Sequence, residues 1–246
     1  SSLRASVVGI SKNALTAFAN PYRVSSMTLP IRVPSLAFHV SSRSGFRPPE
    51  HPRLKLRGYL TVAVAGGGLI LLDPIQRTVI AGLARLLPAK RIAILTWWER
   101  FLAHYMINTV RWVGGANVPT PPTIPGHEGV LVLMNHQSLL DIPLVVAALE
   151  PHHPRIVTRA RYARGKPLIS HMVRLYQYPT VELGATGRES VKRMRQAARE
   201  SPVPIVIYPE GHRTRDGEIG PWQEGGLRMI LGARKWTVWL LVADGY

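Results

Sequence analysis

Short apolar runs alternate with segments of helical periodicity from Gly129 to the C-terminus. The run at 130–134 contains no polar residue, which is typical of a strand buried on both faces, and the run at 203–208 is the strongest predicted strand. This alternation predicts an α/β fold, an αβα sandwich with a mostly parallel sheet whose ligands lie at the carboxyl ends of the strands. We expect strands at 130–134, 155–159, 181–183, 203–208 and 236–243, and helices at 139–149, 167–176, 186–199 and 227–233.

Residues 58–113 precede this pattern and are predicted to form a helical segment that associates with a membrane. The stretch from Tyr59 to Leu72 carries no charge, but it is shorter than the roughly 20 residues that span a bilayer core, and the glycines at 66–68 weaken a helix. We therefore expect 59–97 to form an interfacial or re-entrant hairpin, with a transmembrane helix as the alternative. Either arrangement brings the segment into contact with a membrane.

An amphipathic helix is predicted over residues 98–113. Its apolar residues recur at spacings of three and four, and basic or polar residues line the other side. The apolar face either packs on the domain core or lies in the plane of a membrane, and the sequence supports both interpretations equally. Gly114 and Gly115 are expected to end the helix. The apolar face comprises Trp98, Phe101, Leu102, Tyr105, Met106, Thr109, Trp112 and Val113.

Residues 1–57 are basic and rich in Ser. They contain nine Lys or Arg and one acidic residue, Glu50, without a sustained hydrophobic period. We therefore expect a disordered leader with no packed core of its own. An Arg- and Ser-rich start with few acids resembles an organelle transit peptide, but the chain lacks an initiator Met, so a foreign or read-through segment is the alternative.

The charge balance narrows the classes of partner. Lys and Arg number 31 against 14 Asp and Glu, a net charge of +17 that suits anionic lipid headgroups or nucleic acid. A hydrophobic content of 46% with six Trp favours the lipid surface. The absence of Cys excludes a disulfide, a thiolate nucleophile and a Cys-ligated metal. The pair His152–His153 has neither the spacing nor the third ligand of a zinc site.

A first polar cluster follows the predicted strand at 130–134. His136 lies at the strand end and Asp141 lies five residues further on, so the carboxylate can hydrogen-bond one imidazole nitrogen and leave the other free as a general base. Ser138 and Asp141 also match the start of a helix, so capping is an alternative role for the acid. The two roles are compatible.

A second polar cluster follows the strand at 203–208. It carries Glu210, His212, Arg213 and Arg215 on a predicted turn. Arginine presents a planar fork that binds phosphate through two hydrogen bonds, which suits a phosphorylated ligand. The alternative is an ordinary charged surface turn.

Considered jointly, the two clusters stand in order about seventy residues apart, and in this arrangement the chain resembles the lysophospholipid acyltransferase family, typified by 1-acylglycerol-3-phosphate acyltransferase. Asn135-His136-x-Ser138-x-x-Asp141 is similar to the family's first motif, which contains His-x-x-x-x-Asp. Tyr208-Pro209-Glu210-Gly211-x-Arg213 is similar to its Phe-Pro-Glu-Gly-Thr-Arg motif. The resemblance spans about residues 112–243, so residues 114–246 are expected to form the acyltransferase domain.

The resemblance implies roles for individual residues. His136 is expected to be the general base and Asp141 its orienting partner, with Glu210 and Arg213 at the site of the acceptor phosphate. The reaction implied takes place in a ternary complex without an acyl-enzyme, and needs no metal or bound cofactor. Substrate binding is also carried over to Asn135, Ser138, Gly211 and Arg215.

The same resemblance implies the substrates and the location. A fatty acyl group would pass from acyl-CoA or acyl carrier protein to the free hydroxyl of a lysophospholipid, first of all 1-acylglycerol-3-phosphate, giving phosphatidic acid in phospholipid biosynthesis. We expect contact with anionic membrane lipids and no nucleic acid, at the cytoplasmic face of the inner or plasma membrane. Targeting to an organelle through residues 1–57 is the alternative.

The chain departs from the family pattern in several places. His212 replaces the family's Thr, and the second motif, aligned with 178–183, lacks its Arg. The closing Val-Pro motif would fall at 239–243, where there is no Pro, and the chain ends just beyond, at Tyr246, which predicts a C-terminal truncation. Two other functions stay open: a lipid ester or thioester hydrolase, and a non-catalytic basic protein that binds membranes or nucleic acid.

Overall fold

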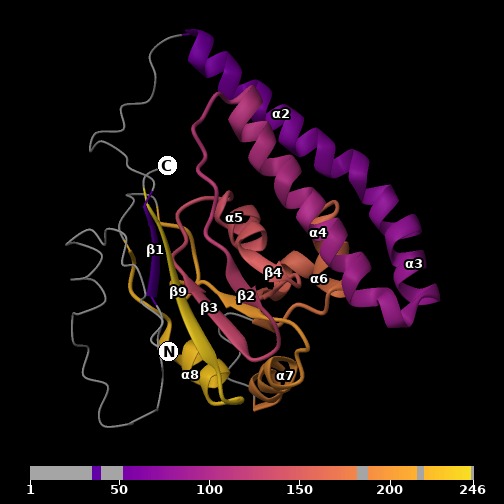
Figure 1. Ribbon diagram of the computed structural model, residues 1–246, viewed down its shortest axis with the longest axis vertical. Coiled ribbons are helices and arrows are strands. Elements are labelled where there is room, and N and C mark those ends of the chain that lie inside the picture. The colour runs from indigo at the N-terminus through magenta and orange to yellow at the C-terminus, as the bar shows by residue number, and fades with distance from the viewer. Residues whose placement is uncertain (1–34, 40–51, 182–187, 215–218, 245–246) are drawn as a thin grey trace, which may run out of the picture.

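The computed structural model describes residues 35–39, 52–181, 188–214 and 219–244. Its centre is a five-stranded sheet in the order β1-β9-β3-β8-β5, in which every neighbouring pair is parallel (Figure 1). The predicted parallel α/β sheet is therefore confirmed. The strands are β1 (Ser35–His39), β3 (Val130–Met134), β5 (Arg155–Ile156), β8 (Ile205–Ile207) and β9 (Thr237–Asp244).

Helices cover both faces of this sheet, because alternate residues of a strand point to opposite sides. Val130, Val132 and Met134 pack in one buried cluster, which includes residues of α4, α5 and α6. Leu131 and Leu133 pack in the other, with α7 and α8. The arrangement is the predicted αβα sandwich. The covering helices are α4 (Arg91–Asn108), α5 (Asp141–Ala148), α6 (Ile169–Leu175), α7 (Arg188–Arg199) and α8 (Glu224–Leu231).

The predicted strand at 155–159 is divided between two sheets. Val157 N still donates to Val206 O of the central sheet, whereas Thr158 N donates to Pro179 O. β6 (Thr158–Arg159) therefore pairs with β7 (Thr180–Val181), away from the central sheet. The capping Thr186 expected before α7 lies outside the described residues. A second small parallel sheet joins β2 (Ile124–Gly126) to β4 (Leu149–Pro151).

Part of the expected leader belongs to the fold. β1 pairs with β9 in parallel, from Ser35 opposite Leu240 to His39 opposite Asp244. The apolar stretch at 36–38 gives a short strand that occupies the outer edge of β9. The expectation of a segment without packed structure is thus wrong for these residues, and the next helix begins at Pro52, ahead of the predicted boundary at 58.

A long apolar helix and α4 form a hairpin that differs from the one predicted within 59–97, because residues 59–86 form one continuous helical stretch. α2 (Pro52–Ile75) continues through a π-helical turn at Gln76–Ile80 into α3 (Ala81–Leu86), and a 3-10 turn at Pro88–Lys90 leads into α4. The stretch Lys55–Leu86 is long and apolar enough to cross a membrane by length and composition. The expectation of a run too short to span, weakened by glycines, is therefore wrong. Asp73 does not end the helix because Arg77 donates to its carboxylate at 2.8 Å.

The predicted apolar face of α4 is split between two directions. Trp98 and Leu102 are buried against the domain, while Phe101 is 42% exposed and Trp112 is 75% exposed. Trp98 is held inward because its Nε1 donates to Oε1 of the fully buried Gln76 at 2.9 Å. Trp97, itself exposed, stacks on Phe101 with ring centroids 6.1 Å apart. α4 therefore packs on the core, as one interpretation of its sequence predicted, and also presents aromatic rings outward. Contact of these rings with a membrane stays a prediction.

Buried polar contacts attach the hairpin to the domain. Gln76 Nε2 donates to Leu168 O at 2.9 Å, and the Tyr176 hydroxyl donates to Leu95 O of α4 at 2.9 Å. The Tyr178 hydroxyl donates to Glu99 Oε1 at 2.5 Å. Glu99 is buried without a cationic partner among the described residues, and burial raises its pKa to about 8. The carboxyl is therefore neutral at pH 7 in the folded chain.

Glu99 is expected to make stability depend on pH. The folded chain holds the proton up to about pH 8, whereas the unfolded chain releases it near the ordinary value of 4.5, so the free energy of unfolding falls as pH rises between these values. The slope is at most about 1.4 kcal/mol per pH unit from this group. Glu99→Gln, which mimics the neutral acid, should flatten the decline in unfolding experiments at a series of pH values. The exposed Glu224→Gln is the matched control, and equal pH profiles for the two variants contradict the prediction.

Candidate active site

The predicted hydrogen bond between His136 and Asp141 is present. His136 follows the carboxyl end of β3, and its Nδ1–H donates to Asp141 Oδ2 at 2.8 Å. Asp141 is the first residue of α5 and is fully buried, while the His136 side chain is 16% exposed. This bond fixes the tautomer of the ring and leaves Nε2 without a proton, as a general base requires.

The carboxylate of Asp141 has two roles at once. Besides the imidazole, its Oδ2 accepts hydrogen bonds from the backbone N–H groups of Gln137 and Ser138, each at 2.8 Å. It thus holds the turn that precedes α5 while it orients His136. The N-cap residue of α5, Leu140, makes no side-chain hydrogen bond, so the capping role weighed from the sequence is not what the structure shows. Ser138 Oγ accepts from Leu140 N at 3.1 Å within the same turn.

Glu210 joins the two sequence motifs. It is fully buried, and its Oε1 accepts from His136 N at 3.0 Å while its Oε2 accepts from Gly220 N at 3.3 Å. Burial raises the pKa of this carboxyl, and these two backbone bonds oppose the rise. In the structure Glu210 thus holds the backbone of His136, and its oxygens are directed at N–H groups.

Further contacts hold the turn of the second motif beside His136. Thr214 N donates to His136 O at 2.9 Å, and the imidazole stacks on the Tyr208 ring with centroids 4.3 Å apart. Gly211 has φ +70°, a conformation that L side chains adopt at a cost, so glycine is required for the turn. Arg213 is exposed next to it, and Arg215 lies outside the described residues.

Asn135 is engaged with the backbone of β9. Its Nδ2 donates to Ala243 O at 2.7 Å, and its Oδ1 accepts from Ala243 N at 2.8 Å. The side chain is buried, so the amide extends the pairing of β3 and β9 beyond the strand end. This placement ties the residue before His136 to the closing strand.

Arg159 is a basic residue of the site that the sequence analysis did not single out. Its Nη2 donates to Gly211 O at 2.6 Å. The pKa of nearby Tyr162 is lowered by a hydrogen bond from Arg161 and by the charges of Arg161, Arg159 and Arg213, which places these cations together. The available signal was the position of Arg159 at the end of a predicted strand, where an α/β fold places its ligands.

The pair His152–His153 was predicted to lie in a loop without a metal-binding function, and in the structure His153 packs inside the domain. His153 is buried, and its Nδ1 lies 2.8 Å from Thr96 Oγ1. Burial, with the positive charges around it, lowers the pKa of His153 to about 3, so it stays neutral. Across the described ranges no three potential metal-ligating residues lie close enough together to hold an ion.

The arrangement therefore combines an oriented base with cations. The imidazole of His136 can take a proton at Nε2, and Asp141 stabilises the charge that results. Arg159 and the exposed Arg213 lie at the turn that is hydrogen-bonded to His136. Such a site suits proton abstraction from a hydroxyl on an anionic molecule.

Comparison with known proteins agrees with this chemistry. The model of the family described as acyltransferase matches residues 110–239. A 1-acyl-sn-glycerol-3-phosphate acyltransferase of Cocos nucifera is 24% identical over 137 residues, which are 53% of this chain and 42% of that relative, so the chain spans less than half of the relative's length. The solved structure of the 1-acyl-sn-glycerophosphate acyltransferase PlsC from Thermotoga maritima has a TM-score of 0.42 and 15% identity, covering 77% of this chain and 82% of that one. Because the family model covers more than half of the chain and includes both polar motifs, the chain belongs to the acyltransferase family.

Proposed function

We propose that the chain transfers a fatty acyl group from a thioester, acyl-CoA or acyl carrier protein, to the free hydroxyl of a lysophospholipid. The foremost acceptor is 1-acylglycerol-3-phosphate, and the product is then phosphatidic acid. The observation that carries the proposal is the hydrogen bond between His136 and the buried Asp141. The turn that carries Arg213 and is bonded to Arg159 is hydrogen-bonded to the backbone of His136. The family match and the Cocos nucifera relative support it.

The proposed step uses the substrate's own hydroxyl as nucleophile. Nε2 of His136 takes the hydroxyl proton as the oxygen forms a bond to the thioester carbonyl carbon. The tetrahedral intermediate then collapses with cleavage of the carbon–sulfur bond, and the imidazolium returns the proton to the sulfur of the leaving thiol. A positioned general base contributes on the order of 100- to 10,000-fold to such a step. No step in this sequence requires a metal or a bound cofactor.

Arg213 and Arg159 are proposed to hold the acceptor's phosphate. Both belong to the cationic group around Tyr162, and Arg159 is fixed by its bond to Gly211 O. Guanidinium groups match phosphate oxygens in pairs, so the phosphate anchors the acceptor while its hydroxyl meets His136. Glu210 acts on the backbone of His136 as a positioning residue in this scheme.

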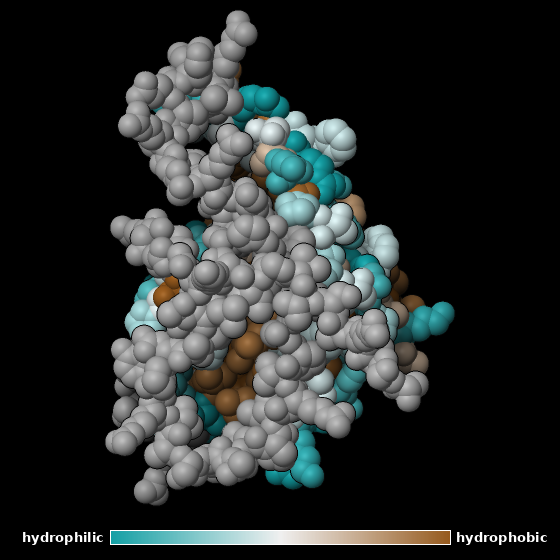
Figure 2. All heavy atoms as spheres, turned by 60° about the vertical axis from the view of Figure 1, so that its left-hand side comes forward, coloured by the Kyte–Doolittle hydropathy of each residue, from teal (hydrophilic) through white to brown (hydrophobic). Residues whose placement is uncertain are grey.

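The exposed hairpin is proposed to bind the membrane from which the acceptor comes. The window of Lys55–Leu86 that is apolar enough to span is not buried in the described structure, and Trp97, Phe101 and Trp112 add exposed aromatic rings. Figure 2 turns the side opposite the hairpin forward, and the hydrophobic atoms at the centre of that face belong to another part of the surface. Aromatic rings prefer the boundary between headgroups and acyl chains, and the net charge of +17 favours anionic lipids.

Removing the base should abolish transfer. His136→Ala is expected to lower kcat by roughly 100- to 10,000-fold in an assay of labelled acyl-CoA with 1-acylglycerol-3-phosphate, because no other group takes the hydroxyl proton. Asp141→Asn should also lower kcat, since its amide no longer stabilises the imidazolium. Product formation by His136→Ala at the wild-type rate contradicts the proposed base. Acyl release that is equal with and without acceptor would instead identify a hydrolase.

The two arginines should act mainly on acceptor binding. Arg159→Gln and Arg213→Gln are each expected to raise KM for 1-acylglycerol-3-phosphate by about 10- to 100-fold, because a charged hydrogen bond to phosphate contributes about 1.5–3 kcal/mol. The exposed Arg164→Gln is the matched control from the same segment. An acceptor without phosphate, a monoacylglycerol, should be insensitive to both changes. An equal loss with both acceptors is inconsistent with phosphate binding.

Aromatic side chains of α4 should strengthen membrane binding. The double variant Trp97→Ala/Phe101→Ala is expected to lower binding to vesicles containing phosphatidylglycerol by about tenfold or more, since each buried ring contributes about 1.5–3 kcal/mol. Trp97→Phe/Phe101→Tyr keeps the rings and is the control. Flotation of the vesicles measures the bound fraction. Unchanged flotation of the double Ala variant shows that these rings lie outside the membrane interface.

A further inference from the structure

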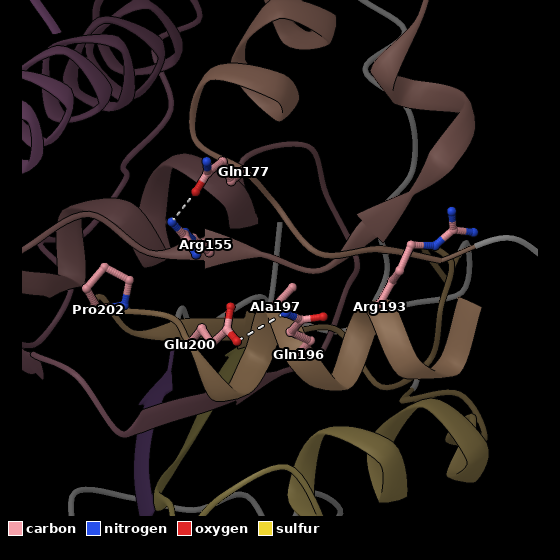
Figure 3. A pocket seen from close by; sticks show the side chains of 7 residues that line it. All are labelled: Arg155, Gln177, Arg193, Gln196, Ala197, Glu200 and Pro202. Carbon is pink, nitrogen blue, oxygen red and sulfur yellow. Dashed lines mark hydrogen bonds between the residues drawn. The ribbon is translucent and has the colours of Figure 1, made fainter. Parts of the chain in front are cut away.

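A cavity lined by polar residues lies toward the amino ends of the strands, away from the candidate active site. It has a volume of about 490 Å³ and is lined by Arg155, Gln177, Arg193, Gln196 and Glu200, among others (Figure 3). Arg155 is the first residue of β5, and β5 runs parallel to β3 through β8. Since His136 follows the last residue of β3, the cavity begins at the amino edge, away from the proposed acceptor site.

Arg155 carries a charge without a counter-ion in this cavity. Its Nη2 donates to Gln177 Oε1 at 2.8 Å, and its Nε is buried without a hydrogen-bond acceptor. Burial lowers the pKa of Arg155, and the positive charge of Arg91 adds to the effect. No carboxylate within the described ranges forms an ion pair with Arg155. A buried donor and an unpaired cation both favour an anion.

Gln177 is held in an unusual conformation to make this contact. Its φ is +56°, in the left-handed region that favours glycine. It follows α6 in a Schellman turn, in which Tyr178 N donates to Val173 O at 3.0 Å and Gln177 N donates to Arg174 O at 3.3 Å. Glycine would fit this turn better but has no side chain to hold Arg155. The strained backbone of Gln177 therefore carries a side chain that lines the cavity and holds Arg155.

The other wall of the cavity is α7. Arg193 is exposed there and forms no ion pair in the part of the chain that the structure describes. Gln196 Nε2 donates to Glu200 Oε1 at 3.2 Å, which occupies one oxygen of the acid (Figure 3). Two arginines and one acid thus line the cavity, with Arg193 at the opposite end from Arg155 and Glu200 (Figure 3). The excess positive charge suits an anion, and Glu200 can accept from a hydroxyl of the same molecule.

We propose that this cavity binds a phosphate monoester. Its two guanidinium groups offer paired donors to phosphate oxygens, and the volume admits a group the size of a nucleotide. One source is the phosphorylated nucleoside of a CoA donor, which rests on the proposed function. Arg155 and Arg159 are four positions apart in the chain, so their Cα atoms lie at most about 14 Å apart. The other source is a lipid headgroup.

Binding measured without catalysis tests the proposal. The full chain carrying His136→Ala, in detergent micelles, is titrated with adenosine 3′,5′-bisphosphate, with inorganic phosphate and with adenosine as the phosphate-free control. Arg155→Gln and Arg193→Gln, each added to this background, are expected to weaken binding of the two phosphate probes by about tenfold. Arg199→Gln, an exposed arginine on α7 outside the cavity, is the matched control.

The probes also separate the two sources. Tighter binding of the bisphosphate than of inorganic phosphate indicates a nucleotide, whereas binding only to phosphatidylcholine vesicles that contain phosphatidate, lost in Arg193→Gln, indicates a headgroup. Thermal unfolding establishes that Arg155→Gln is folded, and Arg193→Gln alters only an exposed position. Equal binding by Arg193→Gln and Arg199→Gln, or no binding of any phosphate probe, overturns the proposal. Failure of acyl transfer by the unmodified chain concerns the proposed function and leaves this result intact.

Discussion

The site depends on one buried carboxylate. Asp141 has no exposed surface, and its Oδ2 alone accepts from the imidazole and from two backbone N–H groups. A buried anion is costly unless donors surround it, and here the donors come from the turn that links β3 to α5. The turn, the start of the helix and the orientation of His136 are therefore a single electrostatic arrangement. A change in any of the three alters the other two.

Glu210 extends this arrangement to the second motif. Because its carboxylate accepts from His136 N and Gly220 N, the strand ends of β3 and β8 are joined across the sheet. The backbone hydrogen bond from Thr214 N to His136 O also holds the second motif against the end of β3. The base and the arginine-bearing turn are thus fixed relative to each other before any substrate arrives. Preorganisation of this kind lowers the reorganisation that a reaction requires.

The sequence predicted those features that depend on local pattern. The apolar run of β3, the parallel α/β class and the pairing of His136 with Asp141 follow from periodicity and spacing. Features that depend on tertiary partners were missed. β1 forms by pairing with the free edge of β9. The strand predicted at 155–159 divides because Thr158 N donates to Pro179 O and not to the central sheet. The sequence analysis ended the uncharged run at Leu72, yet the next residue, Asp73, pairs with Arg77 and accepts from Leu168 N, and the helix continues.

The attachment of the hairpin connects the exposed apolar helix with the site. Gln76 and Glu99 are polar groups buried where the hairpin meets the domain, and each is matched by a donor or acceptor from the segment around α6. Directional bonds of this kind fix the angle between two elements, which apolar packing alone leaves less specified. Tyr178, the partner of Glu99, is followed by β7, which pairs with Arg159 of β6, and Arg159 binds the turn at Gly211. A path of defined contacts therefore leads from the hairpin to the basic side of the site, and under the proposed function this is the side that the lipid acceptor reaches.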